Sequence, residues 1–443
     1  MFPKYKHIHF VGIGGAGMSG LAEVLLNLGY RVSGSDLEKT PVTNRLANLG
    51  TRIYIGHQAR QVGDADVVVV SSAIGQDNCE VVSARRKKIP VIPRAEMLAE
   101  LMRLKYSIVV AGAHGKTTTT SMLAQILALA RLDPTVIIGG KVRGTPSGAR
   151  LGQGEYLVAE ADESDGSFLK LTPTVAVVTN IDREHLDYYH NLRNIKKAFI
   201  EFINKVPFYG AAILSYDDAV VRSILPRVER KYFTYGFTSG ADFKITGQDE
   251  VSFRGKRLGN LFLGLPGRHN LQNALSCIAV SYLLGISFGK VKIALREFKG
   301  VERRMQKIAE INDIIIMDDY GHHPTEIKAT LGTIKKLYPE RRLMVIFQPH
   351  RYTRTKFLFK EFARAFGLAD SLILTDIYPA GESPLRGVSS KLITQELKRS
   401  YEFISPKEKI VDWLAPRIKS GDLVLTIGAG DIWKIARELK TKL

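Results

Sequence analysis

The chain has 443 residues, of which 45% are hydrophobic and 24% charged, a composition typical of a globular protein with about three domains. No apolar run reaches the ~18 residues that cross a bilayer, and the N-terminus enters a strand at once, so we expect no membrane span and no signal peptide. Two cysteines in no metal-binding spacing exclude a disulfide framework and favour a cytoplasmic protein.

The formal net charge of +19 is compatible with two classes of partner. Nucleic acid is one, but the basic residues are scattered in short clusters and form no long basic tail. Highly anionic small substrates are the better interpretation, because a positive field raises their local concentration. We therefore expect no nucleic-acid partner.

The first region, predicted as a Rossmann-like domain over residues 1–103, alternates short apolar runs with amphipathic segments. The expected elements are strands at 7–11, 30–33 and 66–70 and helices at 16–28 and 96–104. Between the first strand and helix, Gly12, Gly14 and Gly17 form a G-x-G-x-x-G motif. Such glycines bring backbone N–H groups and a helix N-terminus to a pyrophosphate. The motif alone does not say whether the ligand is NAD or another nucleotide.

The second region, predicted as a P-loop ATPase-like domain over residues 104–300, carries a second glycine-rich loop, AGAHGKTTTT, at residues 111–120. Lys116 can reach the β- and γ-phosphates of ATP, and the Thr117 hydroxyl can bind Mg²⁺. The loop is a shortened variant, because the residue five positions before Gly115 is Val110 and not glycine. The expected elements here are strands at 107–111, 155–160, 175–179 and 211–215, helices at 117–130, 271–284 and 290–298, and a strand-rich stretch at 231–265.

Acidic clusters follow two of these strands. The first contains Glu160, Asp162, Glu163 and Asp165, and the second contains Asp182, Glu184, His185 and Asp187. Ligands of open α/β sheets gather beyond the carboxyl ends of the strands, and oxygen donors with one imidazole suit Mg²⁺. The third region, predicted as a second Rossmann-like α/β domain over residues 301–443, has expected strands at 314–318, 343–348, 372–376 and 423–427.

Seven motifs in this order resemble those of the Mur ligases, the ATP-dependent amide-forming enzymes of peptidoglycan precursor synthesis. They are residues 11–20 (VGIGGAGMSG), 112–119 (GAHGKTTT), 159–167 (AEADESDGS), 179–186 (TNIDREHL), 267–274 (GRHNLQNA), 318–326 (DDYGHHPTE) and 348–355 (QPHRYTRT). The resemblance covers essentially the whole chain and is closest to the branch that adds alanine.

The resemblance implies that the first domain holds the UDP part of UDP-N-acetylmuramate and not NAD. ATP would phosphorylate the lactyl carboxylate, and the amine of L-alanine would attack the acyl phosphate, giving ADP and phosphate. Two Mg²⁺ ions would assist. The third domain would complete the ATP and amino-acid sites. The resemblance leaves the oligomeric state open between monomer and dimer.

The resemblance also assigns residues to roles. Nucleotide-sugar contacts would be Gly12, Gly14, Gly15, Ala16, Gly17 and Ser72. ATP contacts would be Gly112, Ala113, His114, Gly115, Lys116, Thr117, Thr118, Asn270, Arg304 and Asp319. Metal ligands would be Thr117, Glu160 and His185. Contacts to the sugar or amino acid would be Tyr320, His322, His350, Arg351 and Arg354, and Lys116, His185, His350 and Arg351 would be catalytic. His323 is either a further contact or a helix start, and Arg303 either a site residue or a surface residue.

Three other functions remain open at this stage. A ligase of the same superfamily could attach a recycled peptide, in place of alanine, to the same nucleotide sugar. An NAD-dependent dehydrogenase would explain the first glycine motif but not Glu160, His185 or the third domain. A basic nucleotide-binding regulator would release no phosphate with all substrates present.

Overall fold

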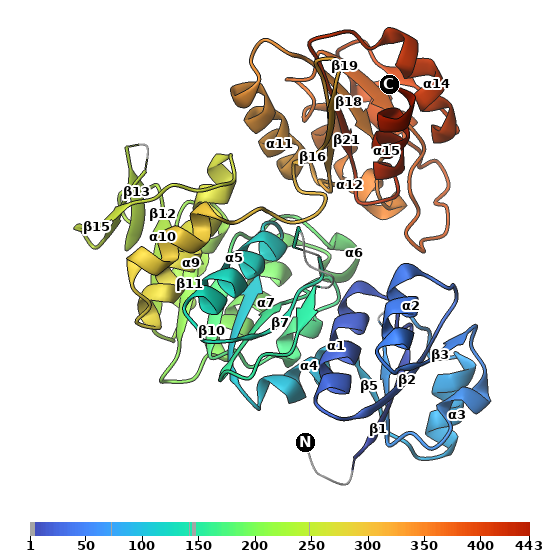
Figure 1. Cartoon of the computed structure of the whole chain (residues 1–443), viewed down its shortest axis with the longest axis vertical. Coiled ribbons are helices and arrows are strands. Elements are labelled where there is room, and N and C mark those ends of the chain that lie inside the picture. The colour runs from blue at the N-terminus through green and yellow to red at the C-terminus, as the bar shows by residue number, and fades with distance from the viewer. Residues whose placement is uncertain (1–4, 72, 141, 144–147, 248) are drawn as a thin grey trace. The chain divides into compact units, whose positions relative to one another are not determined.

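The computed structural model describes residues 5–443 except 72, 141, 144–147 and 248. These residues form two compact units, one made of the described residues up to Leu265 together with Asn270–Gly300 and the other of Pro266–His269 and Val301–Leu443. Within the described residues there are three sheets, two in the first unit and one in the second. Figure 1 shows the first sheet in blue, the second in cyan to yellow-green and the third in orange to red. The α/β fold class with three sheet-based domains agrees with the prediction.

The first sheet is parallel throughout and has the strand order β3-β2-β1-β4-β5. Its strands are β1 (His7–Val11), β2 (Arg31–Asp36), β3 (Arg52–Ile55), β4 (Val67–Val70) and β5 (Val91–Pro93). Its helices are α1 (Ala16–Asn27), α2 (Pro41–Asn48), α3 (Cys79–Arg86) and α4 (Arg94–Met102). The order of winding reverses at β1, between β2 and β4, which is where open α/β sheets bind ligands.

Strand β2 differs from the prediction, which ended it at Ser33. The predicted strand stopped before Gly34, Ser35 and Asp36, which are residue types that favour turns. In the structure all three continue the strand and pair with β3, and Gly34 and Ser35 also pair with β1. A Cβ atom on Gly34 would lie 2.6 Å from Ile13 Cδ1 and 2.7 Å from Phe10 O, so the glycine is needed for close packing.

The second sheet has ten strands in the order β15-β14-β13-β12-β11-β10-β6-β9-β7-β8. They are β6 (Tyr106–Ala111), β7 (Thr135–Ile137), β8 (Ala149–Arg150), β9 (Tyr156–Glu160), β10 (Val175–Val178), β11 (Ala211–Ser215), β12 (Tyr232–Gly236), β13 (Phe243–Thr246), β14 (Glu250–Phe253) and β15 (Lys256–Asn260). The helices are α5 (Lys116–Leu129), α6 (Leu186–Tyr189), α7 (Leu192–Asn204), α8 (Ala219–Ile224), α9 (Arg268–Leu283) and α10 (Phe288–Arg296). Strand β6 pairs with β9 and β10, so the ends of all three strands lie together.

One hydrophobic core joins the first two sheets. It contains Leu21 and Leu25 of α1 and Leu98 of α4, together with Val109 of β6 and further residues of the second sheet. Both glycine-rich loops therefore belong to one packed unit.

The third sheet has the order β16-β17-β21-β18-β19-β20 and is parallel except for the β16–β17 pair. Its strands are β16 (Gln306–Ile311), β17 (Ile314–Asp319), β18 (Arg342–Phe347), β19 (Ser371–Leu374), β20 (Glu402–Phe403) and β21 (Asp422–Ile427). Its helices are α11 (Pro324–Leu337), α12 (Tyr352–Ala363), α13 (Lys391–Glu396), α14 (Ile410–Leu414) and α15 (Trp433–Lys442). None of the helices in the described part of the chain has the length and hydrophobicity needed to cross a lipid bilayer.

Candidate active site

The first glycine-rich loop is held by hydrogen bonds to the end of β2. Gly12 N–H donates to Ser35 O at 2.9 Å, and Gly14 N–H donates to Asp36 Oδ2 at 2.7 Å. The Asp36 carboxylate therefore helps to hold the loop in place. Gly15 is the N-cap of α1, and Ala16 and Gly17 begin the helix. We expect an anion to meet the N–H groups of that first turn, since helix N-termini leave them without intrahelical partners. Ser72 lies outside the described residues.

The phosphate loop runs from β6 to α5 and requires its glycines. Gly112 has φ +132°, and a Cβ atom there would lie 2.2 Å from Thr179 Oγ1. Gly115, with φ +83°, is the N-cap of α5 and packs against Asn273. The loop thus adopts a backbone conformation that L side chains rarely allow.

Hydrogen bonds from Thr179 and Asn180 hold this loop against the end of β10, and we call this arrangement the Asn180 latch. The Asn180 side chain accepts a hydrogen bond from His114 N–H at 2.9 Å and donates one to His114 O at 3.0 Å. Thr179 Oγ1 also donates to His114 O, at 2.6 Å, and Ala113 N–H donates to Asn180 O at 3.3 Å. His114 Nε2 lies 3.0 Å from Asp182 Oδ2. No role was predicted for Asn180, because nothing local in the sequence shows that it reaches a loop 66 residues earlier.

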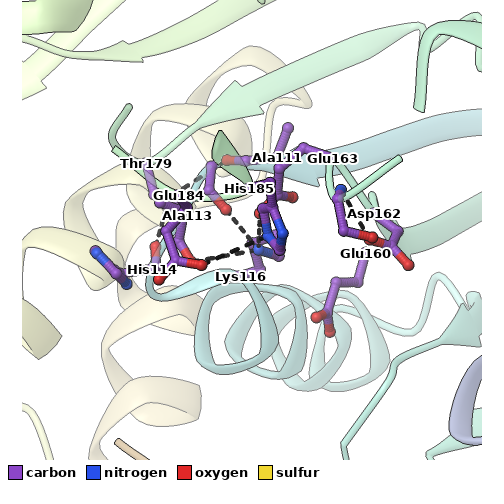
Figure 2. A network of polar contacts seen from close by, with 12 residues as sticks. Ala111, Ala113, His114, Lys116, Glu160, Asp162, Glu163, Thr179, Glu184 and His185 are labelled. Carbon is purple, nitrogen blue, oxygen red and sulfur yellow. Dashed lines mark hydrogen bonds and ion pairs between the residues drawn. The ribbon is translucent and has the colours of Figure 1, made fainter. Parts of the chain in front are cut away.

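Lys116 lies at the start of α5 and reaches across the loop (Figure 2). Its Nζ donates to Gly112 O at 2.6 Å and to Glu163 Oε1 at 2.7 Å. Burial acts to lower the pKa of Lys116, but the carboxylates of Glu163 and Glu160 outweigh it and raise this pKa, which keeps the ammonium charged. Burial raises the pKa of Glu163 to about 7 against the opposing effect of Lys116.

Two of the three expected metal ligands are in direct contact. Thr117 Oγ1 lies 3.1 Å and 3.0 Å from the two carboxylate oxygens of Glu160. The third expected ligand, His185, contacts a different carboxylate, since its Nε2 lies 3.9 Å from Glu163 Oε1. Figure 2 shows His185 beside Lys116, with Glu160 and Asp162 next to each other.

The donor types of the three expected ligands fit Mg²⁺, which prefers oxygen ligands. Thr117 and Glu160 offer a hydroxyl and a carboxylate side by side, and His185, beside Glu163, offers an imidazole. Among the described residues, Glu163 Oε2 is a buried oxygen without a hydrogen-bond partner, as expected beside a site that receives a cation.

Two further residues expected to contact ATP are buried in helices of the same unit. Thr118 lies in the first turn of α5, and Asn270 in the first turn of α9. A Cβ atom on Gly115 would lie 2.7 Å from Asn273 Oδ1, so α9 contacts the phosphate loop. Asn270 shares a helix face with Asn273 by its i, i+3 spacing. Asn273 was not predicted, although the N-L-Q-N spacing in the motif was a usable signal.

In the second unit, Arg304 and Asp319 form part of one polar network. Asp319 is buried and accepts hydrogen bonds from Met305 N–H and Gly321 N–H, both at 2.7 Å. Arg304 Nη1 donates to Glu326 Oε1 at 3.2 Å. Burial acts to lower the pKa of Arg304, but Glu326 and Asp319 outweigh it and raise this pKa, so the guanidinium stays charged.

The expected substrate residues of the second unit form an aromatic and basic cluster. The rings of Tyr320 and His322 are 5.5 Å apart, and those of His322 and His350 are 5.7 Å apart. Arg354 Nη1 lies 3.0 Å from His350 Nδ1, which must be the acceptor because a guanidinium only donates. Arg351 is the N-cap of α12, with φ +71°.

Arg303 and His323, for each of which the sequence left two interpretations open, have structural roles. Arg303 donates to Asp318 Oδ2 at 2.9 Å and to the carbonyl oxygens of Gly430 and Gly428 at 3.0 Å and 2.6 Å, so it is not a surface residue. His323 is the N-cap of α11 and forms a capping box with Glu326. The helix-start interpretation of His323 therefore has direct structural support.

An open pocket of about 320 Å³ connects the two glycine-rich loops within the first unit. Gly15 and Gly17 line it from the first loop, and Lys116 from the second. The remaining lining residues are Met18, Ser71, Arg94, Ile137, Ile138, Gly139, Glu160, Ala161 and Asp162. A ligand held at the first loop can therefore extend toward Lys116 and Glu160.

Three family models match the chain in succession. They describe the catalytic domain of the Mur ligase family at residues 7–106, the Mur ligase middle domain at 110–281 and the Mur ligase glutamate ligase domain at 303–430. The UDP-N-acetylmuramate–L-alanine ligases of Geotalea daltonii and Geobacter sulfurreducens are 54% and 52% identical to it, covering the whole chain and 99% of each relative.

Two solved structures are similar to this chain over almost its whole length. The crystal structure of the UDP-N-acetylmuramate–alanine ligase of Thermotoga maritima is similar with a TM-score of 0.84 and 31% identity, and 99% of each chain is covered. That of a murein peptide ligase of Psychrobacter arcticus is similar with a TM-score of 0.74 and 27% identity, with 98% of each chain covered.

Proposed function

Since this chain belongs to the Mur ligase family, we propose that it joins L-alanine to the lactyl carboxylate of UDP-N-acetylmuramate and converts ATP to ADP and phosphate. The observation that carries this proposal is the pocket between the two glycine-rich loops. A diphosphate at Gly15 and Gly17 would leave the sugar and its carboxylate pointing toward Lys116 and Glu160. Relatives at 52–54% identity over the full chain carry the name of this activity.

The chemistry requires activation of a carboxylate, because oxide is a poor leaving group and phosphate a good one. Lys116 would hold the γ-phosphate of ATP and offset the charge that develops on it during transfer. The N–H groups of the phosphate loop, held by Asn180 and Thr179, would orient the phosphate chain. No covalent intermediate with the protein is needed.

Magnesium would be held by Thr117, Glu160 and His185, where it would supply positive charge to the phosphate oxygens and the carboxylate. Residues of the second unit would contribute the rest of the site. Arg304 and Asp319 would meet ATP, and the cluster of Tyr320, His322 and His350 would meet the substrates. Arg351 and Arg354 supply guanidinium groups suited to carboxylate and phosphate.

The compartment we propose is the cytoplasm, in agreement with the free thiols of both cysteines. The proposed small-molecule partners are UDP-N-acetylmuramate, L-alanine and ATP.

A second candidate function is the attachment of a recycled peptide to the same nucleotide sugar. The structural similarity of this chain to the murein peptide ligase of Psychrobacter arcticus, with a TM-score of 0.74, supports this candidate. The first candidate is preferred because the relatives named for alanine addition are the more similar in sequence.

One assay separates the candidates. Phosphate release is measured with ATP, Mg²⁺ and UDP-N-acetylmuramate, and the third substrate is varied among L-alanine, L-serine, glycine and L-alanyl-D-glutamyl-diaminopimelate. We expect L-alanine to give the highest kcat/KM. A preference for the tripeptide would support the second candidate, and release with none of these acceptors would contradict both.

A further inference from the structure

Arg94, the first residue of α4, connects the first domain to the acidic segment after β9. Its Nη2 donates to Asp162 Oδ2 at 2.9 Å, and its side chain is only 20% exposed. The side chain also lies against the first turn of α1. A Cβ atom on Gly17 would be 2.8 Å from Arg94 Nη1 and 3.0 Å from its Cδ. The last glycine of the G-x-G-x-x-G motif therefore leaves room for this arginine.

The charge of Arg94 is incompletely offset by its surroundings. It begins one helix and lies against the start of another, and both helix N-termini carry partial positive charge. Among the described residues, Asp162 is its one acidic partner, and its Nε and Nη1 groups make no hydrogen bond to any of them. A guanidinium in this state can bind a phosphate and keep its carboxylate partner, because its donors point in different directions.

Asp162 connects Arg94 to the ATP side of the pocket. It stands two residues after Glu160 and one before Glu163, which contact Thr117 and Lys116. The same pocket is lined by Arg94, Asp162, Glu160 and Lys116.

We propose that Arg94 and Asp162 link the two ligand sites, so that the diphosphate of a nucleotide sugar and a magnesium nucleotide triphosphate each favour binding of the other. The inference rests on the proposed function. A phosphate bound by Arg94 fixes its guanidinium, which fixes Asp162 and the segment from Glu160 to Glu163. Triphosphate binding orders the same segment from the other side through Lys116 and Thr117. Whichever ligand binds second meets a segment that is already ordered, and linkage makes the effect reciprocal. Arg94 is a substrate contact and Asp162 a positioning residue.

Calorimetric titration of the full chain tests this link. The affinity for a non-hydrolysable ATP analogue with Mg²⁺ is measured without and with saturating UDP-N-acetylmuramate, and the affinity for UDP-N-acetylmuramate is measured alone. In the unaltered chain we expect the nucleotide sugar to tighten analogue binding about 5-fold or more. Arg94→Ala should weaken UDP-N-acetylmuramate binding about 10-fold or more and abolish the tightening.

Asp162→Asn provides the readout that separates positioning from binding. It should change UDP-N-acetylmuramate affinity less than about 3-fold, because Arg94 is retained, yet remove the tightening of analogue binding. Arg45→Ala is the matched control, since Arg45 forms a partly buried ion pair with Glu23 in the same domain but does not line the pocket. Arg45→Ala should leave both the UDP-N-acetylmuramate affinity and the tightening of analogue binding unchanged. If Arg94→Ala does not fold, Arg94→Lys, which keeps the positive charge, replaces it.

Three results of these titrations would contradict the proposed link. Independent binding of the two ligands in the unaltered chain overturns the link, as does full tightening in Asp162→Asn. Unchanged UDP-N-acetylmuramate affinity in folded Arg94→Ala also overturns it. Failure of the unaltered chain to bind UDP-N-acetylmuramate at all would contradict the proposed function instead.

Discussion

Replacing Asn180 with alanine is expected to weaken ATP binding while leaving nucleotide-sugar binding intact. The Asn180 side chain makes two hydrogen bonds to the backbone of His114, at 2.9 Å and 3.0 Å. Each contributes ~1 kcal/mol net, so their joint loss of ~2 kcal/mol corresponds to about 30-fold in affinity. The loss is partial because Thr179 Oγ1 and Ala113 N–H still hold the loop.

Calorimetric titration with a non-hydrolysable ATP analogue, together with KM and kcat from phosphate release, checks this expectation. Asn180→Asp should weaken ATP binding at least as much, because its carboxylate accepts from His114 N–H but places a charged oxygen against His114 O. Asn204→Ala is the matched control, since Asn204 bonds to Arg227 O and Glu229 N–H in the same two-sided way in another loop. An Asn180→Ala chain that binds the analogue within about 3-fold of the unaltered chain would refute the role of the latch.

Three further predictions follow from other parts of the structure. Lys116→Ala should reduce phosphate release more than tenfold, because Nζ lies within the phosphate loop, 2.6 Å from Gly112 O; a loss below ~1.4 kcal/mol in activation free energy contradicts the assignment. The full chain should bind UDP-N-acetylmuramate and not NAD in a calorimetric titration, and tight NAD binding would reverse the interpretation of the first glycine loop. Burial acts to raise the pKa of Glu80, but hydrogen bonds from His9, Ser35 and His57 outweigh it and lower this pKa. The ionised form is therefore favoured by folding, so the destabilisation caused by Glu80→Gln should be full above pH 4.5 and shrink as pH falls below it. Thermal unfolding across this range measures it, and a difference that grows at low pH would show the opposite sign.

Much of the fold follows from the sequence alone. Strands β1 and β11 were predicted at their observed bounds, and helix α5 is shifted by one residue at each end. These elements have strong local patterns, since β1 and β11 are short apolar runs and α5 begins directly after a glycine-rich loop, and local pattern was sufficient to predict them. The seven motifs likewise predicted the family that the comparisons confirm.

Tertiary structure was needed wherever distant residues meet. Gly34, Ser35 and Asp36 are residue types that favour turns, but pairing with β3, and for the first two also with β1, holds them extended. Short strands such as β7 and β20 were not predicted, because two or three residues carry no usable periodicity.

The candidate site divides in the same way. Lys116 and Thr117 could be identified from the sequence because a phosphate loop is contiguous along the chain. The Asn180 latch, the Lys116–Glu163 ion pair and the Arg94–Asp162 link join residues 66, 47 and 68 positions apart. Such contacts depend on which strands become neighbours in the sheet and on how the first domain packs against the second. No local pattern encodes that adjacency, so only the tertiary structure decided it.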